Sequence, residues 1–256
     1  MKNRLTDELA ICGLNAARAA AEIHPGTINR LFLRQDRLPL FSGVCKQLAE
    51  RKRPYKITDD EELSIICKTA HHQGVVAMIE RPVVEPLSRE DLDLWQNESK
   101  TGIVLHDIGN DHNLGALARA AAFFDAHFVV ISEREKEAAL TTSAYRVAEG
   151  GMEHIIIRSV YRTEAFLRDA SKQILTVGTS LRARRRIGEL RGLIAERQSE
   201  TKRRPGIALV FGNEEAGLPA QVEEACAVLL RIPGSGKIDS LNVSHAASIF
   251  LNECYD

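Results

Sequence analysis

Three short stretches of this sequence place glycines and polar side chains directly after an apolar segment. The last of them covers residues 232–253 and reads IPGSGKIDSLNVSHAASIFLNE. Its pattern predicts the end of a strand, a loop with Gly234 and Gly236, and then a helix. Ser240 or Asn242 can cap that helix by accepting hydrogen bonds from its first N–H groups. Such a loop can hold a ligand, although an ordinary loop before a last helix is the alternative interpretation.

Two earlier stretches have the same organisation. Residues 209–218 read LVFGNEEAGL, an apolar strand that runs into a loop with glycines. Residues 113–119 read NLGALAR, follow an apolar strand at 103–105 and begin a helix. Apolar strands that alternate with helices predict a parallel sheet, in which ligands bind at the carboxyl ends of the strands. All three stretches are therefore expected at one shared site.

Taken together, the three stretches resemble the signature of the SpoU/TrmH family of RNA ribose 2′-O-methyltransferases, in the SPOUT superfamily. The first family motif, N-x-G-x-x-x-R, is met by Asn113, Gly115 and Arg119. The second, F-G-x-E-x-x-G-L, is met by Phe211, Gly212, Glu214, Gly217 and Leu218. The third, I-P-x-x-G followed by S-L-N-V-S, is met by Ile232, Pro233, Gly236, Ser240, Leu241, Asn242, Val243 and Ser244. Three motifs in this order are far more specific than any one of them alone.

The resemblance implies S-adenosylmethionine as the cofactor and no metal. Its catalytic residues would be Asn113, Arg119, Glu214, Ser240 and Asn242. The cofactor would lie against the loops that contain Thr179, Gly212, Ile232 and Leu241. No G-x-G-x-x-G follows the first strand of this region, which argues against a Rossmann-type pocket.

Arg119 is the residue to which the resemblance gives the central catalytic role. The pKa of an arginine lies above about 12, so a neutral guanidinium that accepts a proton is costly. We therefore expect Arg119 to contact the RNA phosphate and the 2′-oxygen and to stabilise the developing alkoxide. The alternatives for these positions are structural: Asn113 and Ser240 as helix caps, Arg119 as a surface residue and Glu214 as a loop acid.

Composition limits the class of protein. The chain has 256 residues, 44% of them hydrophobic and 27% charged, which is ordinary for a globular enzyme. Its formal net charge is −1, so an RNA site must be a local patch. The five cysteines are scattered without metal-ligand spacing, which indicates reduced thiols. The absence of a signal-peptide pattern or a membrane-spanning run predicts a cytoplasmic protein that does not enter a membrane.

One connection in the sequence is strongly basic. Residues 181–205 contain nine arginines and lysines against three glutamates. Because the guanidinium fork matches phosphate geometry, this segment is predicted to contact RNA. The residues singled out for this role are Arg182, Arg184, Arg185 and Arg186. A solvated loop with a helical turn is the alternative.

The expected fold class is α/β, in two domains. Residues 1–82 alternate short helices and strands, and Gly13-Leu14-Asn15-Ala16 with the stretch HQGVVA at 72–77 resembles the family's L30e-like RNA substrate-binding domain. Residues 83–100 are predicted to be an interdomain linker with one helical turn around Asp91–Trp95, anchored to one domain by Trp95. Residues 101–256 repeat strand then helix and predict the parallel-sheet SPOUT methyltransferase domain. The resemblance adds a C-terminal trefoil knot.

The sequence thus predicts an S-adenosylmethionine-dependent methyltransferase that acts on a ribose 2′-OH of tRNA or rRNA. The alternative is a non-catalytic RNA-binding protein that retains the SPOUT fold, since Asn110-Asp111-His112 replaces the D-P-x usual before Asn113. A homodimer is also predicted, because the apolar residues of 243–254 cover more than one face of a helix. Packing of that helix on residues 114–124 of the same chain is the alternative to a dimer contact.

Overall fold

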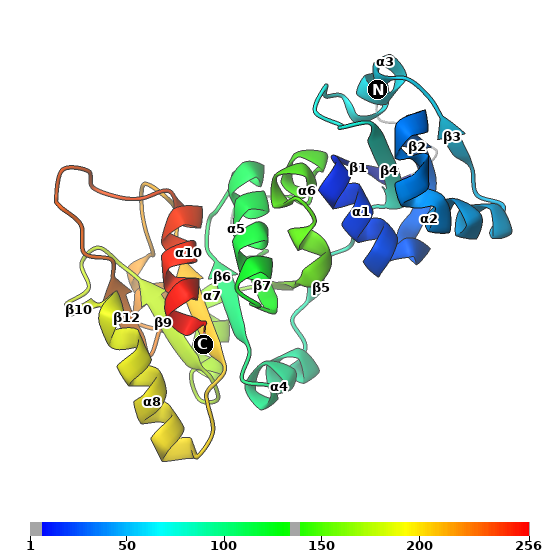
Figure 1. The fold of residues 1–256 in the computed structure, drawn as a ribbon. Coiled ribbons are helices and arrows are strands. Elements are labelled where there is room, and N and C mark those ends of the chain that lie inside the picture. Colours follow the sequence, from blue (N-terminus) through cyan, green and yellow to red (C-terminus); the bar gives the residue numbers. More distant parts are fainter. Residues whose placement is uncertain (1–6, 134–138, 256) are drawn as a thin grey trace. The chain divides into compact units, whose positions relative to one another are not determined.

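The computed structural model describes residues 7–133 and 139–255, which form two compact units (Figure 1). The first unit contains the chain up to Val83 together with the segment Ala139–His154. The second unit contains Val84–Ala138 and everything from Ile155 onward. In the described parts of the chain, no helix is both long and apolar enough to cross a bilayer.

The first unit is built on a four-stranded sheet with the order β1-β4-β2-β3. Strand β4 is antiparallel to both of its neighbours, whereas β2 and β3 are parallel. The small α/β domain predicted from the sequence is therefore present, with one strand, β1, that the sequence pattern did not predict. The bounds are β1 (Glu8–Cys12), α1 (Leu14–Ile23), η1 (Pro25–Thr27), β2 (Ile28–Leu33), η2 (Gln35–Arg37), α2 (Leu38–Glu50), β3 (Tyr55–Ile57), α3 (Asp60–Cys67) and β4 (Val75–Glu80).

The segment Ala139–His154 packs on the first unit although it follows strands of the second in sequence. It forms α6 (Thr142–Ala148), which lies against β1, and η3 (Gly151–His154), which lies against α1. Gly150 has φ +97°, and a Cβ there would stand 2.9 Å from the Cβ of Ala19, so the close contact with α1 requires glycine. The predicted boundaries, with all of 101–256 in one domain, therefore differ from the compact units.

The second unit is built on an eight-stranded sheet with the order β10-β12-β9-β11-β6-β7-β8-β5. All neighbouring strands are parallel, and every residue of the central strands β6 and β11 is buried. Continuous apolar runs are what a sheet covered on both faces requires, so the predicted parallel sheet is confirmed. The strands are β5 (Glu85–Pro86), β6 (Thr101–Leu105), β7 (Phe128–Ser132), β8 (Ile156–Val160), β9 (Leu175–Thr179), β10 (Arg185–Arg186), β11 (Ile207–Phe211) and β12 (Val228–Arg231).

The last helix, α10, packs along α5 and against β11 (Figure 1). Phe250 of α10 and Phe211 of β11 make an edge-to-face contact with ring centroids 5.8 Å apart, which helps to hold α10 on the sheet. The packing of α10 on residues 114–124, weighed above as the alternative to a dimer contact, is thus present. The helices are α4 (Arg89–Asn97), α5 (Asp111–Phe123), α7 (Thr163–Ala170), α8 (Leu190–Thr201), α9 (Ala220–Glu223) and α10 (Val243–Cys254), with η4 (Ile187–Glu189).

The connection from β12 to α10 has an unusual path. Strands β9 and β11 lie between β12 and β6, yet α10 packs on α5, which follows β6. Residues 232–242 therefore carry the chain across the ends of two strands. The trefoil knot implied by the family resemblance stays a prediction.

The segment predicted as a linker, residues 83–100, is part of the second unit. Ser88 and Asp91 form a capping box at the start of α4, and β5 pairs with β8. Trp95 is fully buried, stacks on Phe128 at 4.8 Å and donates a hydrogen bond to the carbonyl of Ile207 at 3.0 Å. The prediction that Trp95 anchors the segment is confirmed. The segment's two prolines and many charges predicted only a helical turn, whereas the structure contains the packed helix α4.

A buried carboxyl in the first unit generates a prediction about stability. The side chain of Glu153 is only 9% exposed, 3.7 Å from His24. Burial raises the pKa of the Glu153 carboxyl, and His24 opposes this only in part. A raised pKa means that the folded state holds the proton more tightly, so the stabilisation is complete below the ordinary pKa of about 4.5 and is lost as the pH rises through the folded-state pKa.

We therefore expect Glu153→Gln to be more stable than the wild type at about pH 7, with the difference shrinking toward about pH 4. Urea unfolding of the whole chain at both pH values measures this. Glu50→Gln, at the exposed end of α2, is the matched control and should change little at either pH. A wild type more stable than Glu153→Gln at pH 7 would contradict the argument.

Candidate functional site

The three polar stretches follow β6, β11 and β12, at the carboxyl ends of these strands. The backbone N–H of His106 donates to the carbonyl of Phe211 at 2.9 Å, which joins the ends of β6 and β11. At β6 the chain order changes direction, with β7 on one side and β11 on the other. Such a switch point is where ligands bind in open parallel sheets.

A chain of side-chain hydrogen bonds connects all three stretches. The amide nitrogen of Asn113 donates to a carboxylate oxygen of Glu214. The amide nitrogen of Asn242 donates to the amide oxygen of Asn113 at 3.0 Å. The amide oxygen of Asn242 in turn accepts from the backbone N–H and the hydroxyl of Ser244, at 2.9 and 2.6 Å. Three of the five predicted catalytic residues are therefore in direct contact.

Of the predicted catalytic residues, only Asn242 caps a helix at the site. Asn110, not Asn113, caps α5 by accepting from the N–H of His112 at 2.8 Å. Asn242 caps α10, and Ser240 lies exposed with no hydrogen bond to any other described residue. The structural alternative for Asn113 and Ser240, that they are only helix caps, is therefore wrong.

The loop after β11 is held in a tight turn. The side-chain oxygen of Asn213 accepts from the N–H groups of Glu215 and Ala216, both at 3.0 Å, and its amide nitrogen donates to the carbonyl of Asp107 at 3.1 Å. A Cβ on Gly212 would stand 2.5 Å from the carbonyl of Gly217, so the turn closes only with glycine. This packing fixes Glu214 in place. The role of Asn213 was missed from the sequence, although an asparagine before two acids is a turn signal.

Arg119 lies on α5, six residues after Asn113, and its side chain is exposed. Six residues of helix correspond to about 9 Å along the axis. Arg119 therefore stands beyond the hydrogen-bonded chain, on the solvent side of the same helix. An exposed guanidinium there can reach an external phosphate or hydroxyl.

Two of the residues predicted to bind the cofactor, Ile232 and Leu241, are the ends of one open loop. Backbone groups of residues 232–241 make no hydrogen bond to other backbone groups in the described chain, although the N–H of Lys237 donates to the hydroxyl of Ser235 at 3.4 Å. Most of the loop's backbone donors and acceptors are therefore available to a ligand. Leu241 and Ile238 are 50% and 81% exposed in the same loop. Apolar side chains beside unpaired backbone groups suit an adenosine moiety, with its aromatic base and polar edges. Thr179 faces inward, and its hydroxyl donates to the carbonyl of Val210 at 3.0 Å.

The packing beneath this loop is dense. A Cβ on Gly178 would stand 2.6 Å from Leu229 and 2.9 Å from the sulfur of Cys226. Burial raises the pKa of the Cys226 thiol to about 12, so it stays a neutral packing group. In residues 7–133 and 139–255, no group of three or more His, Cys, Asp or Glu side chains is arranged to hold a metal ion.

The basic connection forms more structure than was predicted. It contains β10, which pairs with β12, and the helix α8 of 12 residues instead of a single turn. Arg182 is paired with Glu223 at 3.2 Å, and Arg185 lies 4.0 Å from Glu189.

Two of the four predicted RNA-binding arginines are not paired with an acid among the described residues. The side chains of Arg184 and Arg186 are exposed and form no ion pair in the described structure. The strand register places Arg231 beside Arg186, which adds a third basic residue that the sequence pattern did not single out. The alternative's loop with a helical turn is therefore an edge strand followed by a helix, with exposed arginines next to the loop of residues 232–241.

Two family models match the chain. Residues 100–252 match the model described as "SpoU rRNA Methylase family". Residues 10–83 match the model described as "RNA 2'-O ribose methyltransferase substrate binding". The first match covers most of the second unit together with the segment Ala139–His154, and the second match covers the N-terminal part of the first unit.

Known proteins similar to this chain agree with these models. The 23S rRNA (guanosine-2'-O-)-methyltransferase RlmB of Nitrosomonas europaea is 30% identical over 255 residues, 98% of this chain and 92% of that protein. RlmB of Photobacterium profundum is 31% identical, with 95% of each chain covered. The AdoMet-bound rRNA methyltransferase of Sinorhizobium meliloti has the same fold, with a TM-score of 0.75 at 24% identity, covering 96% of this chain and 86% of that one. This chain belongs to the SpoU rRNA methylase family.

Proposed function

We propose that this protein transfers the methyl group of S-adenosylmethionine to a ribose 2′-OH in RNA. The hydrogen-bonded chain Glu214–Asn113–Asn242, which joins the three family motifs, is the observation that carries the proposal. Ribosomal RNA is the first substrate class to test, because the relatives similar over the whole chain are named as 23S rRNA (guanosine-2'-O-)-methyltransferases. Transfer RNA is the second.

The cofactor residues act mainly through the backbone. Bound S-adenosylmethionine supplies an electrophilic methyl group on a sulfonium. The loop from Ile232 to Leu241 offers unpaired backbone groups and apolar side chains to its adenosine part, and Gly212 lets the backbone after β11 come close to it. Thr179 fixes the neighbouring loop through its bond to Val210.

The catalytic residues divide into positioning and contacting groups. Glu214, Asn113 and Asn242 hold the loops and α5 in register, while Ser240 and Arg119 face solvent, where RNA arrives. On transfer, the 2′-oxygen would take the methyl group that bound S-adenosylmethionine supplies, leaving a neutral thioether, and the proton of the 2′-OH would pass to solvent water. Arg119 donates to the 2′-oxygen and the adjacent phosphate and so stabilises the negative charge that develops.

Arg119→Ala is expected to lower kcat about a hundredfold or more, because the variant has no exposed cation aimed at the alkoxide. Transfer of labelled methyl to rRNA and nucleoside mass spectrometry measure this, with cofactor affinity by calorimetry. Arg168→Ala, an exposed arginine of α7, is the control and should keep full activity. A wild type that binds RNA but methylates neither rRNA nor tRNA would favour the non-catalytic RNA-binding alternative.

The basic edge at β10 is proposed to hold RNA phosphates beside the site. Arg184 and Arg186 would supply most of the affinity, because acids already neutralise Arg182 and Arg185. Arg231, in register with Arg186, extends the edge toward the loop that begins at Ile232.

The double variant Arg184→Gln with Arg186→Gln is expected to weaken RNA binding about tenfold at low salt. It should also lower the salt slope by roughly 0.7 for each RNA phosphate that the variant no longer neutralises. Fluorescence anisotropy over a salt series measures both quantities. The control, Arg182→Gln with Arg185→Gln, removes the same charge but should have the smaller effect; equal effects would contradict the assignment.

A homodimer through α5 and α10 remains our proposal. One side of α10 already packs on α5, so only the outer surface is available. That surface carries Phe123, Tyr255 and Ile249, which are 79%, 53% and 38% exposed. Phe124 links them, with its ring 6.1 Å from that of Tyr255. Arg119 lies one turn before Phe123 on α5, so a partner there would stand next to the catalytic arginine.

Phe123→Glu is expected to convert a dimer into a monomer and to abolish methyl transfer, because a charge replaces an apolar contact. Light scattering at low micromolar concentration and the methylation assay measure this. Ile65→Glu, equally apolar and 70% exposed on α3, should leave the dimer intact. A fully active monomeric wild type would contradict the proposal.

A further inference from the structure

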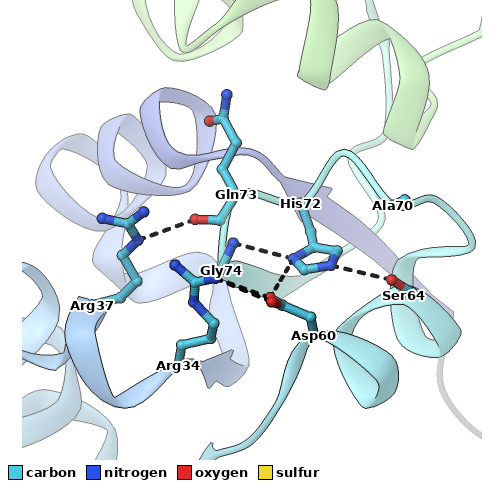
Figure 2. Close-up of a pocket in the computed structure, with 8 residues that line it drawn as sticks. All are labelled: Arg34, Arg37, Asp60, Ser64, Ala70, His72, Gln73 and Gly74. Carbon is cyan, nitrogen blue, oxygen red and sulfur yellow. Dashed lines mark hydrogen bonds and ion pairs between the residues drawn. The ribbon is translucent and has the colours of Figure 1, made fainter.

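The first unit contains a polar pocket of about 370 Å³ between η2, α3 and the turn before β4 (Figure 2). Its lining is Arg34, Arg37, Asp60, Ser64, Ala70, His72, Gln73 and Gly74. This volume is at the lower end of the range for small-molecule sites. The pocket is therefore too small to admit a double helix. A single extended group can enter.

The back wall of the pocket is rigid. The imidazole of His72 is 4% exposed, and its Nδ1 accepts from the N–H of Gly74 at 3.1 Å. The proton of the neutral ring is then on Nε2, which lies 3.2 Å from the hydroxyl of Ser64. Because Nε2 donates to that oxygen, the hydroxyl hydrogen of Ser64 is left for another acceptor.

The guanidinium of Arg34 already donates hydrogen bonds to two carboxylates. It donates to both oxygens of Asp36, each at 3.0 Å, and to Asp60 at 3.1 and 3.3 Å. A Cβ on Gly74 would stand 2.8 Å from the Nε of Arg34, and Gly74 has φ +82°, so only glycine allows the guanidinium to lie across the turn. Arg34 therefore positions Asp60, whose side chain stays 59% exposed and keeps lone pairs for a further donor.

Arg37 has spare donors. Its Nε donates to the carbonyl of Gln73 at 3.1 Å, which orients the guanidinium. Within the described chain its two Nη groups donate no hydrogen bond. Figure 2 shows them at the pocket's edge, pointing away from the turn. Asp60 also lies 3.9 Å from Nδ1 of His72, and Asp36 lies 3.7 Å from Nε of Arg37. The pocket thus offers a fixed, exposed carboxylate that can accept from a further donor and a guanidinium whose Nη groups can donate to an acceptor.

This pair of requirements selects the ligand. An inorganic phosphate could accept from Arg37, but it is compact, so its negative charge would also lie against the carboxylate of Asp60. A ribonucleotide satisfies both, with its hydroxyls donating to the carboxylate and its phosphate accepting from the guanidinium. Only an unpaired nucleotide fits the volume, and the 2′-OH distinguishes RNA from DNA.

We propose that this pocket binds one unpaired ribonucleotide of the RNA substrate, with Asp60 accepting from the ribose hydroxyls and Arg37 contacting the phosphate. The proposal rests on the function proposed above, since it assigns a subsite for the same RNA. The first unit would then recognise the ribose and phosphate of single-stranded RNA, with no requirement for a particular base.

The test uses the whole chain with a ten-nucleotide single-stranded RNA of mixed sequence, containing one 4-thiouridine, and the same sequence in DNA. Anisotropy gives both affinities. Arg37→Gln is expected to weaken RNA binding about tenfold. Asp60→Asn should lower the preference for RNA over DNA while leaving DNA affinity within about twofold. Arg51→Gln removes the same charge at the far end of α2, about 20 Å from Arg37, and should change neither affinity.

Photo-crosslinking locates the nucleotide. Crosslinks to the peptides that contain residues 34–37 or 70–74 support the pocket, and their absence, or equal effects of Arg37→Gln and Arg51→Gln, overturns it. With rRNA, Arg37→Gln should raise KM and leave kcat unchanged. An unchanged KM in an active enzyme would overturn the pocket alone. A wild type without methyl transfer, but with the expected crosslinks, would overturn the proposed function alone.

Discussion

The amide of Asn113 is the contact on which the second unit's site depends. One end donates to the carboxylate of Glu214 and the other accepts from Asn242, so three segments far apart in sequence share one side chain. Among the short side chains, only asparagine offers a donor and an acceptor at this reach. An aspartate at 113 would set two carboxylates against each other, and a serine would be too short to span both partners.

That contact is possible only because of the parallel sheet. Parallel strands bring their carboxyl ends to one edge, and the strand order places β11 directly beside β6. The packing of α10 on α5 then returns Asn242 from the distant strand β12 to the first turn of α5. Burial of the central strands therefore determines where the polar groups meet, and the loop of residues 232–241 is left open between them.

The sequence predicted what depends on local pattern and missed what depends on packing partners. Six strands of the second unit, the helix from Val243 and the contacts among the motifs follow from apolar periodicity and strand ends, whereas the two-residue edge strands β5 and β10 were not predicted. The helix α4 was taken for a linker because charges dominate its sequence, although Leu92 and Trp95 suffice to bury it. The position of α6 on β1 could not be predicted, since a helix's own pattern does not specify which unit it covers. The place of Arg231 in the basic edge could not be predicted either, because it depends on the pairing of β12 with β10, which sets Arg231 beside Arg186.

Net charge says little about where this chain meets RNA, because carboxylates decide which arginines remain available. Arg34 and Arg37 both lie near Asp36, yet the guanidinium of Arg34 donates hydrogen bonds to Asp36 and Asp60, whereas the Nη groups of Arg37 donate none in the described chain. Arg182 is paired with Glu223, whereas Arg184 forms no ion pair among the described residues. The engaged arginines hold other groups in position, as Arg34 holds Asp60. The less engaged ones point to solvent, at the pocket of the first unit and at the edge strand of the second. A protein of net charge −1 can thus present local cationic groups without a basic surface, and its paired acids determine which arginines remain available to phosphates.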